Sequence, residues 1–416
     1  MQAMTVKDSR ATTAGAQKRG TLRVVLYSHD SQGLGHTRRN LALAHALTGS
    51  FRRAGRTVSG VLVTGVAAAT RFEIPEGWDW VVVPGIAKGT GGYEARHLGV
   101  QQKDIIKLRS SLIAAVFHDF RPHLVVVDRH PFGVEHELAN GLEQLRREHP
   151  SCRVVLGLRE VLDQPSAARR EWTALDLDQV DRTFDEFWVY GDPLVHDPVR
   201  SGEIPGSLAH LVRHTGYLSL GRPVRRRTGA TGVPFVVTMA GGGSDGLDVT
   251  LTAARARLPE GLEHLIVTGP QMPKGDRAQV EAAAGPGTHV VGSVRDALAE
   301  IQSAAAVVAM GGYNTVCEIM STTTPALIVP RVHPRREQLI RARGLARHRL
   351  LDFCHPDEFT PDTLSTWWAQ VGGQEVARDG VNLDGLATTY EYASELLAQP
   401  DNSSQRRTDW TRHAAV

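Results

Sequence analysis

The stretch from Ala306 to Ile319 reads AVVAMGGYNTVCEI and contains one complete supersecondary unit. Its first five residues are apolar and predict a buried strand, which Gly311 and Gly312 follow directly. Apolar residues then recur at helical spacing through Val316 and Ile319. A glycine turn between a strand and a helix leaves main-chain N–H groups unobstructed, and such groups bind phosphate oxygens. The stretch therefore predicts a parallel α/β fold with an anion site at the carboxyl end of its sheet.

The same order of strand, loop and helix recurs on both sides of this stretch. Apolar runs predict strands over residues 22–27, 58–63, 80–83, 124–127, 153–158 and 186–189, and again over 234–239, 265–268, 289–291, 306–310 and 326–329. Helical spacing is present over residues 103–120, 135–148, 247–258, 294–301, 337–346 and 383–397. Strands that alternate with helices indicate doubly wound parallel sheets.

A glycine-rich, basic and apolar-poor run (GRPVRRRTGATG) separates the two series. We therefore expect two Rossmann-like domains facing a central cleft. They occupy residues 21–220 and 233–382, with a linker at 221–232 and a C-terminal helix at 383–399. Residues 1–20 and 400–416 are small and polar, and we expect a disordered leader and tail there.

Composition excludes several classes of protein. Among 416 residues, 47 Lys and Arg face 45 Asp and Glu, and this balance argues against a dedicated nucleic-acid binder. Three widely spaced cysteines predict neither a disulfide framework nor a CxxC metal site, and they favour a reducing, cytoplasmic setting. No apolar run approaches the ~18 residues of a transmembrane helix. The N-terminus has no apolar segment of the kind found in secretory signals.

The second half of the chain carries a second glycine loop, Gly241–Gly246, after the predicted strand 234–239. Tight turns also use glycine, but two such loops in one domain fit a diphosphate better than two chance turns do. Glu318 lies one helical turn beyond Asn314, where a carboxylate can accept hydrogen bonds from a ribose diol or simply face solvent. Glu337 and Gln338 open a helix from which they can contact sugar hydroxyls.

The first half offers a candidate base. His36 follows the predicted strand 22–27 and the glycines Gly33 and Gly35, and an imidazole suits proton transfer near neutral pH. His29 is the rival. Asp128 ends a buried strand, where it can orient His36, contact a substrate or serve as a structural cap.

Four motifs together resemble one family. They are GGGSDG at 241–246, GSVRD at 292–296, MGGYNTVCEI at 310–319, and PALIVP at 325–330 with EQLIRA at 337–342. In order and spacing they resemble the C-terminal half of MurG-like glycosyltransferases, the family 28 group with the GT-B fold, whose glycine loop reads GGSQG. The loop Gly33-Leu34-Gly35-His36 with Arg39 is similar, more thinly, to the family's Gly-Gly-His loop.

The resemblance implies a role for each matched position. The loop around Ser244 would meet the donor diphosphate, the main chain of Ser293 and Val294 the nucleobase, Glu318 the ribose and Gln338 the donor sugar. His36 would be the general base, with Asp128 beside it. The donor-binding set so implied is Gly35, Gly242, Gly243, Ser244, Asp245, Gly246, Ser293, Val294, Gly311, Gly312, Asn314, Thr315, Glu318, Arg331, Glu337 and Gln338.

Three positions depart from the family pattern. Gly311 stands where the family often has Ser, Glu337 where it often has Gln, and Arg341 where it has Asn. These departures lie near the donor and leave the identity of its sugar and nucleotide open.

The implied activity is transfer of a sugar from a nucleotide-diphosphate sugar, such as UDP-N-acetylglucosamine or UDP-glucose, to a hydroxyl or amine. It would proceed with inversion and without a metal or other cofactor. The acceptor is an unidentified small molecule or lipid-linked compound, for which 85–99 is a candidate loop, and the basic run 51–56 leaves open a weak contact with an anionic membrane surface.

Two other readings compete with transfer. An epimerase of the same fold needs carboxylates near the sugar, for which Glu337 is the one candidate, and a non-catalytic nucleotide-sugar-binding partner subunit needs no His36. The pair Asp176 and Asp178 has DxD spacing but lies in a polar helical stretch, and His130 and His136 lack a convincing metal-ligand set, so no metal site is predicted.

Overall fold

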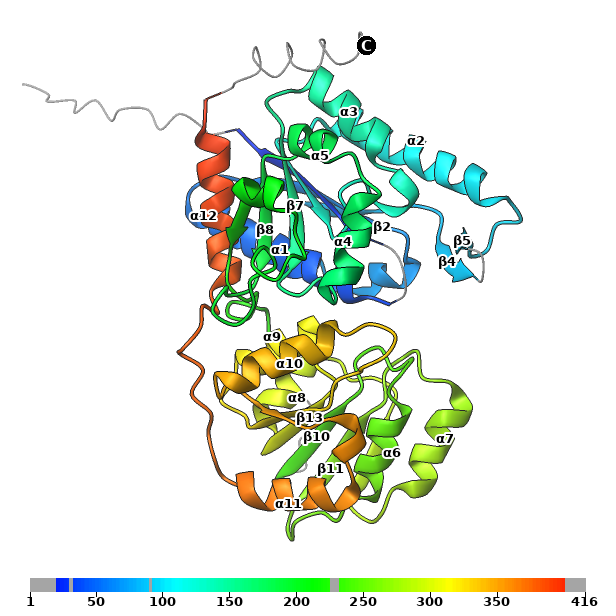
Figure 1. Ribbon diagram of the computed structural model, residues 1–416, viewed down its shortest axis with the longest axis vertical. Coiled ribbons are helices and arrows are strands. Elements are labelled where there is room, and N and C mark those ends of the chain that lie inside the picture. Colours follow the sequence, from blue (N-terminus) through cyan, green and yellow to red (C-terminus); the bar gives the residue numbers. More distant parts are fainter. Residues whose placement is uncertain (1–19, 30–32, 90–91, 225–231, 401–416) are drawn as a thin grey trace, which may run out of the picture.

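The structure is a computed structural model that describes residues 20–29, 33–89, 92–224 and 232–400. It has two α/β domains, one above the other in Figure 1. The first contains a seven-stranded sheet in the order β3-β2-β1-β6-β7-β8-β9, and the second a six-stranded sheet in the order β12-β11-β10-β13-β14-β15. Both sheets are parallel throughout. The GT-B class expected from the sequence is therefore the class observed.

The first domain is built from these elements. Its sheet contains β1 (Leu22–Tyr27), β2 (Val58–Thr64), β3 (Trp78–Val82), β6 (Leu124–Asp128), β7 (Arg153–Arg159), β8 (Glu186–Tyr190) and β9 (Val212–His214). Its α-helices are α1 (Gly35–Arg53), α2 (Gln102–Phe120), α3 (Ala139–Glu148), α4 (Pro165–Thr173) and α5 (Leu177–Thr183). The 3₁₀ turns η1 (Ala67–Arg71), η2 (Val134–His136) and η3 (Gly206–Leu211) and an antiparallel hairpin of β4 (Ile86–Gly89) and β5 (Gly92–Ala95) complete it.

The second domain repeats the pattern. Its strands are β10 (Phe235–Met239), β11 (Glu263–Val267), β12 (Thr288–Val291), β13 (Ala306–Ala309), β14 (Ala326–Ile328) and β15 (Asp352–Phe353). Its helices are α6 (Leu247–Arg255), α7 (Lys274–Ala283), α8 (Ala297–Ser303), α9 (Tyr313–Met320), α10 (Glu337–Arg347), η4 (Pro356–Glu358) and α11 (Pro361–Val371). The last helix, α12 (Gly385–Ala398), lies beside the first domain (Figure 1).

Both sheets have a topological switch point next to their first strand. β1 pairs with β2 on one side and β6 on the other, and β10 pairs likewise with β11 and β13. Ligands of such sheets bind beyond the carboxyl ends of the strands at this point. The loops after β1, β6, β10 and β13 are the ones that carry most of the candidate residues.

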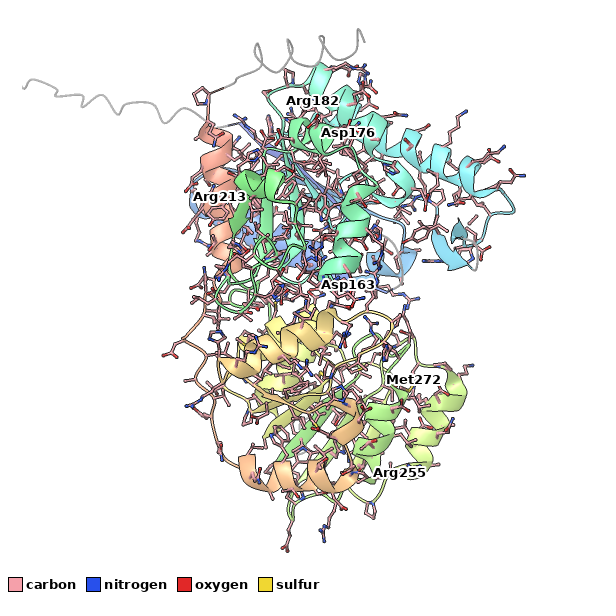
Figure 2. The ribbon with its side chains drawn as sticks, viewed as in Figure 1. Asp163, Asp176, Arg182, Arg213, Arg255 and Met272 are labelled. Atoms are coloured by element: carbon pink, nitrogen blue, oxygen red, sulfur yellow. The ribbon has the colours of Figure 1, made fainter. Side chains whose placement is uncertain are left out.

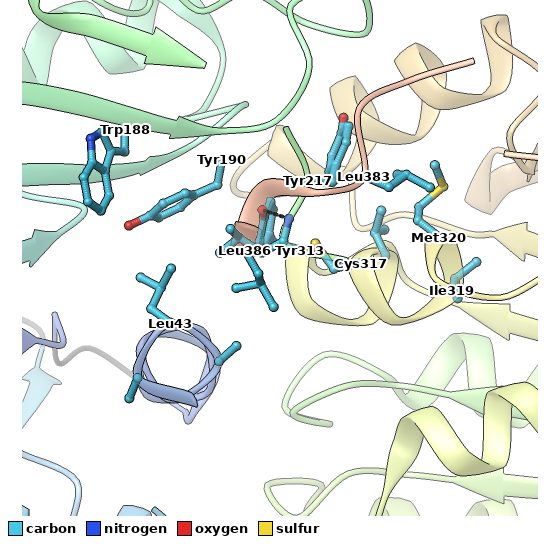
Figure 3. Close-up of a cluster of buried hydrophobic side chains, with 14 of the residues drawn as sticks. Leu43, Trp188, Tyr190, Tyr217, Tyr313, Cys317, Ile319, Met320, Leu383 and Leu386 are labelled. Carbon is cyan, nitrogen blue, oxygen red and sulfur yellow. Dashed lines mark hydrogen bonds between the residues drawn. The ribbon is translucent and has the colours of Figure 1, made fainter. Parts of the chain in front are cut away.

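One apolar cluster crosses from the first domain to the second. It joins Leu43 of α1 and Tyr190 of β8 to residues of α9 and of the chain leading into α12 (Figure 3). The rings of Tyr217 and Tyr313 stack with centroids 6.4 Å apart, and the Tyr313 hydroxyl accepts a hydrogen bond from the Leu218 main-chain N–H at 3.3 Å. Buried apolar contact of this kind fixes how the two carboxyl edges face each other.

Two predicted helices begin later than the sequence suggests. The helix expected from residue 135 begins at Ala139, because Glu135 and His136 adopt left-handed φ angles of 47° and 61°. The helix expected from residue 294 begins at Ala297, where Asp296 caps the Leu298 and Ala299 N–H groups. The spacing of apolar residues indicates neither a helix cap nor a left-handed turn, so the prediction made both helices too long at their N-terminal ends.

Parts of several predicted segments lie outside the described residues. These are residues 1–19 of the leader, 225–231 of the linker, 401–416 of the tail, and 90–91 of the candidate acceptor loop. Within the described ranges, no helix is both long and apolar enough to cross a membrane.

Candidate functional site

His36 and Asp128 meet at the switch point of the first sheet. His36 stands in the first turn of α1, and Asp128 is the last residue of β6. Their Nδ1 and Oδ2 atoms are 2.5 Å apart, while the other carboxylate oxygen accepts from Arg39 Nη2 at 2.5 Å and Nε at 3.1 Å. Asp128 is buried, whereas the His36 side chain is 19% exposed. Since the carboxylate holds Nδ1, the Nε2 edge of His36 is left for a substrate.

The surroundings of this pair keep the Asp128 carboxyl group ionised and the His36 imidazole neutral. Burial alone would raise the pKa of Asp128, but Arg39 and His36 outweigh it and hold that pKa well below its usual range. Burial lowers the pKa of His36 from its ordinary value, and Asp128 opposes this only in part. A neutral imidazole with one bonded nitrogen is the form that accepts a proton.

Two glycine loops lie at the carboxyl edge of the second sheet. Gly243 and Gly269 have φ angles of 93° and 90°, and a Cβ on Gly269 would come within 2.6 Å of the main chain of Gly242. Only glycine fits this contact. The loop Gly241–Gly246 leads into α6, and Gly311 and Gly312 lead into α9. Among the described residues, no side chain caps either helix. Free N–H groups at both helix starts suit an anion.

Glu318 lies between the two domains. It is buried on α9, and its Oε1 accepts a hydrogen bond from Arg38 of α1, while Arg222 Nη1 is 3.9 Å away. Its Oε2 is buried and has no hydrogen-bond partner within the ranges that the structure describes. Asn314 Nδ2 donates to the Gly35 carbonyl at 2.8 Å, which ties the start of α9 to the start of α1. One oxygen of Glu318 is thus positioned and the other is available to a ligand hydroxyl.

Arg331 links three of the predicted donor residues. Its guanidinium donates to Asp245 Oδ2 at 2.9 Å and to Glu337 Oε1 at 2.5 Å, and its main-chain N–H donates to Gln338 Oε1 at 2.9 Å. In the described part of the chain, Glu337 Oε2 is buried without a hydrogen-bond partner. Arg159 comes first among the charges that lower the pKa of Glu337 below its ordinary value, against the effect of burial. Glu337 is therefore an ionised carboxylate with one free oxygen.

The remaining predicted donor residues lie apart from this network. Ser244 and Ser293 are exposed, and Val294 and Thr315 are half-buried. Ser293 and Val294 follow β12, and Thr315 is in the first turn of α9. The structure holds them at the same edge of the sheet, but among the described residues their side chains make no polar contact with the first domain.

A buried ion pair between the domains escaped the sequence reasoning. Glu160 follows β7 and Arg341 lies on α10, and neither side chain is exposed. Arg341 donates to both carboxylate oxygens, at 2.6 and 3.0 Å, and to the Gly311 carbonyl at 3.0 Å. Nearby, Asp163 Oδ1 accepts the Arg336 main-chain N–H at 3.1 Å; Figure 2 labels Asp163 at the edge of the first domain that faces the second.

Arg159 is a second residue that was missed. It ends β7, its buried Nε has no hydrogen-bond partner among the described residues, and burial lowers its pKa to about 9. Its positive charge acts on both His36 and Glu337, so it lies near the candidate base and near the candidate sugar site. The available signal was a charged pair, Arg159-Glu160, directly after the apolar run 154–158.

Within the described ranges, no group of three or more His, Cys, Asp or Glu is arranged to hold a metal ion. The DxD pair is accounted for locally, because Asp176 caps α5 by accepting from the Gln179 N–H.

Comparison with known proteins gives one sequence relative and many structures. No family model matches the chain. The relative is the UDP-N-acetylglucosamine–N-acetylmuramyl-(pentapeptide) pyrophosphoryl-undecaprenol N-acetylglucosamine transferase of Glaesserella parasuis, 28% identical over 144 residues. The match covers 34% of this chain and 40% of that protein, so the chain spans less than half the length of the relative it matches.

The similar structures share the fold at low identity. The glycotransferase of kitacinnamycin has a TM-score of 0.57 at 15% identity, covering 91% of this chain and 99% of that one. A UDP-N-acetylglucosamine 2-epimerase structure from Listeria monocytogenes has a TM-score of 0.55 at 12% identity, covering 94% of each chain. SnogD from Streptomyces nogalater has a TM-score of 0.52 at 14% identity, covering 95% of this chain and 100% of that one. The chain thus has the GT-B fold and resembles MurG-like glycosyltransferases.

Proposed function

We propose that this chain, a MurG-like protein with the GT-B fold, transfers a sugar from a nucleotide-diphosphate sugar to an acceptor hydroxyl or amine. One observation carries the proposal. The His36–Asp128 pair at the start of α1 lies beside the uncapped start of α9, to which Asn314 and Gly35 tie it at 2.8 Å. A proton acceptor and an anion site thus lie on opposite sides of one domain boundary.

The donor would lie mainly against the second domain. The N–H groups at the starts of α6 and α9 would bind its diphosphate, and the free oxygen of Glu318 would accept from the ribose. Gln338 and Glu337 would face the donor sugar. A uridine nucleotide, as in UDP-N-acetylglucosamine or UDP-glucose, is the donor we favour, because the matched relative is named for UDP-N-acetylglucosamine.

The reaction would be a direct displacement with inversion. The acceptor oxygen attacks the anomeric carbon and loses its proton to His36 Nε2, while the bond from that carbon to the diphosphate oxygen breaks. The products are the glycosylated acceptor, the nucleoside diphosphate and a protonated His36, which Asp128 stabilises across the 2.5 Å contact. Contact between the two domains would exclude water from the reacting centre.

The departing diphosphate needs positive charge. Helix N-termini supply part of it, and we assign Arg159 as a further contact because its guanidinium lies near His36 without a hydrogen bond of its own among the described residues. These groups would do the work that a metal ion does in other transferases, so we propose metal-independent transfer. The three free cysteines suit the cytoplasm as its location.

An epimerase is the second candidate. Glu337 is a buried carboxylate with one unpaired oxygen, and a structure named as an epimerase shares the fold. Transfer is favoured because His36 and Asp128 form a base with its orienting acid, which a carboxylate mechanism does not need. A non-catalytic nucleotide-sugar-binding subunit would not need the His36–Asp128 pair either.

Nucleotide binding tests the donor site directly. We expect calorimetric titration to detect UDP binding, and Ser244→Ala to weaken it by about 0.5–1.5 kcal/mol, the scale of one hydrogen bond. Ser303→Ala is the matched control, because Ser303 lies in the same domain but its hydroxyl donates to the Ala299 carbonyl of its own helix. Absence of binding by UDP, TDP and GDP alike would contradict the donor site, as would equal effects of the two variants.

A further inference from the structure

A pocket in the first domain adjoins the His36–Asp128 pair. Its volume is about 310 Å³, and it lies beyond the carboxyl end of β6, against α4. The residues that line it are His29, Tyr93, Arg129, His130, Pro131, Phe132, Gly133, Val134, Glu135, His136, Glu171, Trp172, Ala174, Leu175 and Arg335. His29 connects the pocket to the candidate base, since its ring centroid is 5.4 Å from that of His36 and 4.4 Å from that of His130.

The loop that forms one wall is held in an unusual conformation. Arg129, Glu135 and His136 have left-handed φ angles of 73°, 47° and 61°. Residues other than glycine adopt such angles at a cost, and these conformations concentrate at ligand sites. The Arg129 N–H donates to the Gly157 carbonyl at 2.9 Å, and the Leu138 N–H donates to the Phe132 carbonyl at 2.9 Å, so the wall is fixed before any ligand arrives.

The pocket has apolar walls and no net charge. Phe132 and Trp172 are buried in its lining, and Tyr93 adds a third aromatic ring. Two arginines and two glutamates line it, and one glutamate, Glu171, faces both arginines: Arg129 Nη2 donates to its Oε2 at 2.6 Å, and Arg335 Nη2 lies 3.9 Å from its Oε1. A phosphate would therefore find its nearest cations already paired.

Two imidazoles supply free polar groups. In the part of the chain that the structure describes, neither His29 nor His130 has a side-chain hydrogen bond, and His29 is 6% exposed. Burial lowers the pKa of both rings well below the ordinary value, so both are neutral near pH 7. A neutral imidazole offers one N–H donor and one acceptor, which is the pairing that a hydroxyl needs.

We propose that this pocket binds the acceptor, and that the acceptor is an uncharged, hydroxylated ring compound whose hydroxyls bond to His29 and His130. Flat rings would pack between Phe132, Trp172 and Tyr93, and the reacting hydroxyl would extend past His29 to His36. Arg335 comes from the second domain, so domain contact completes the pocket. The inference rests on the proposed transferase function and narrows its acceptor from small-molecule or lipid-linked compounds in general to neutral, hydroxylated ring compounds.

Binding of small probes tests the inference. Three neutral phenols (4-methylumbelliferone at pH 6.5, resveratrol and naringenin) are titrated with saturating UDP present, and geranyl diphosphate serves as the anionic, lipid-like probe. We expect at least one phenol to bind, and Ala174→Trp, which fills the rim of the pocket, to weaken it at least tenfold. The His29→Ala/His130→Ala double variant should weaken it similarly. Ala282→Trp, an exposed substitution on α7 of the other domain, is the matched control and should change nothing.

Three results would overturn the inference. They are the absence of binding by all three phenols, phenol binding that Ala174→Trp leaves unchanged, and geranyl diphosphate binding that Ala174→Trp abolishes. The same titrations report UDP affinity before any probe is added. Normal UDP binding with a failed pocket test removes only the acceptor inference, whereas absent UDP binding removes the proposed function.

Discussion

Replacing His36 with alanine separates the chemical step from folding and donor binding. The change removes the imidazole with its Nε2 edge but leaves Asp128 bonded to Arg39 at 2.5 and 3.1 Å. No buried charge loses its last partner, and the removed ring is 19% exposed. We therefore expect the free energy of unfolding to fall by about 1 kcal/mol, the ordinary cost of a single substitution.

The expected kinetic effect is much larger. A positioned general base contributes about 10²–10⁴-fold to rate, which corresponds to about 2.7–5.4 kcal/mol of transition-state stabilisation. Donor affinity should stay within about twofold, because the diphosphate and ribose contacts belong to the second domain. His45→Ala is the matched control: His45 lies on the same helix, and its Nε2 is 3.2 Å from the Glu73 carbonyl.

The assay is UDP release from the nucleotide sugar with an accepted hydroxyl compound, followed from pH 5 to 8. Burial lowers the pKa of His36 below its ordinary value of 6.5. The imidazole is therefore neutral at pH 6.5 and above, and it becomes protonated only at lower pH. Wild-type turnover should therefore be constant at neutral pH and fall as the pH drops through this lowered pKa. In His36→Ala the acid limb should disappear along with most of the turnover. Near-normal turnover of that variant, or loss of donor affinity equal to the loss of rate, would refute the reasoning.

The remaining predictions concern the donor, the metal and the domain boundary. Glu318→Ala should weaken UDP binding by about 1.5–3 kcal/mol, as expected for hydrogen bonds to a charged group, and an unchanged calorimetric affinity would refute the ribose assignment. Turnover should survive excess EDTA, and complete loss that magnesium or manganese restores would exclude the leaving-group scheme. Glu160→Gln should lower the free energy of unfolding by about 3–5 kcal/mol, because it leaves the buried Arg341 without the carboxylate to which it is bonded. Adding Arg341→Met should recover most of that loss in chemical denaturation, and two additive losses would show that the pair is not coupled.

Much of the fold followed from local pattern. Most of the predicted strands match observed ones within two residues, since a buried parallel strand is a continuous apolar run with sharp ends. The strands β9 and β15 were missed because they are short edge strands, and the hairpin of β4 and β5 because its residues do not alternate clearly. Left-handed residues such as Glu135 depend on tertiary contacts, which spacing does not encode.

The candidate site was predicted in part. Contact with His36 was one of three roles left open for Asp128, and it is the one observed, because each residue ends or follows a buried strand and parallel strands bring such positions to one edge. Contacts across the domain boundary could not be predicted from the sequence in this way. Two ion pairs, Arg38–Glu318 and Arg341–Glu160, join residues that no hydrophobic periodicity relates. Only the packing of the two domains brings these residues together.

The central claim is transfer of a sugar from a nucleotide sugar, and the fate of the donor tests it most directly. The purified protein is incubated with ¹³C-labelled UDP-, TDP- and GDP-sugars and a panel of hydroxyl and amine acceptors, and the anomeric signals are followed by NMR from the first minutes. The account predicts release of nucleoside diphosphate and a glycoside whose anomeric configuration is opposite to that of the donor. An epimerised nucleotide sugar, a glycoside formed with retention, or a donor that binds and stays intact with every acceptor would contradict it.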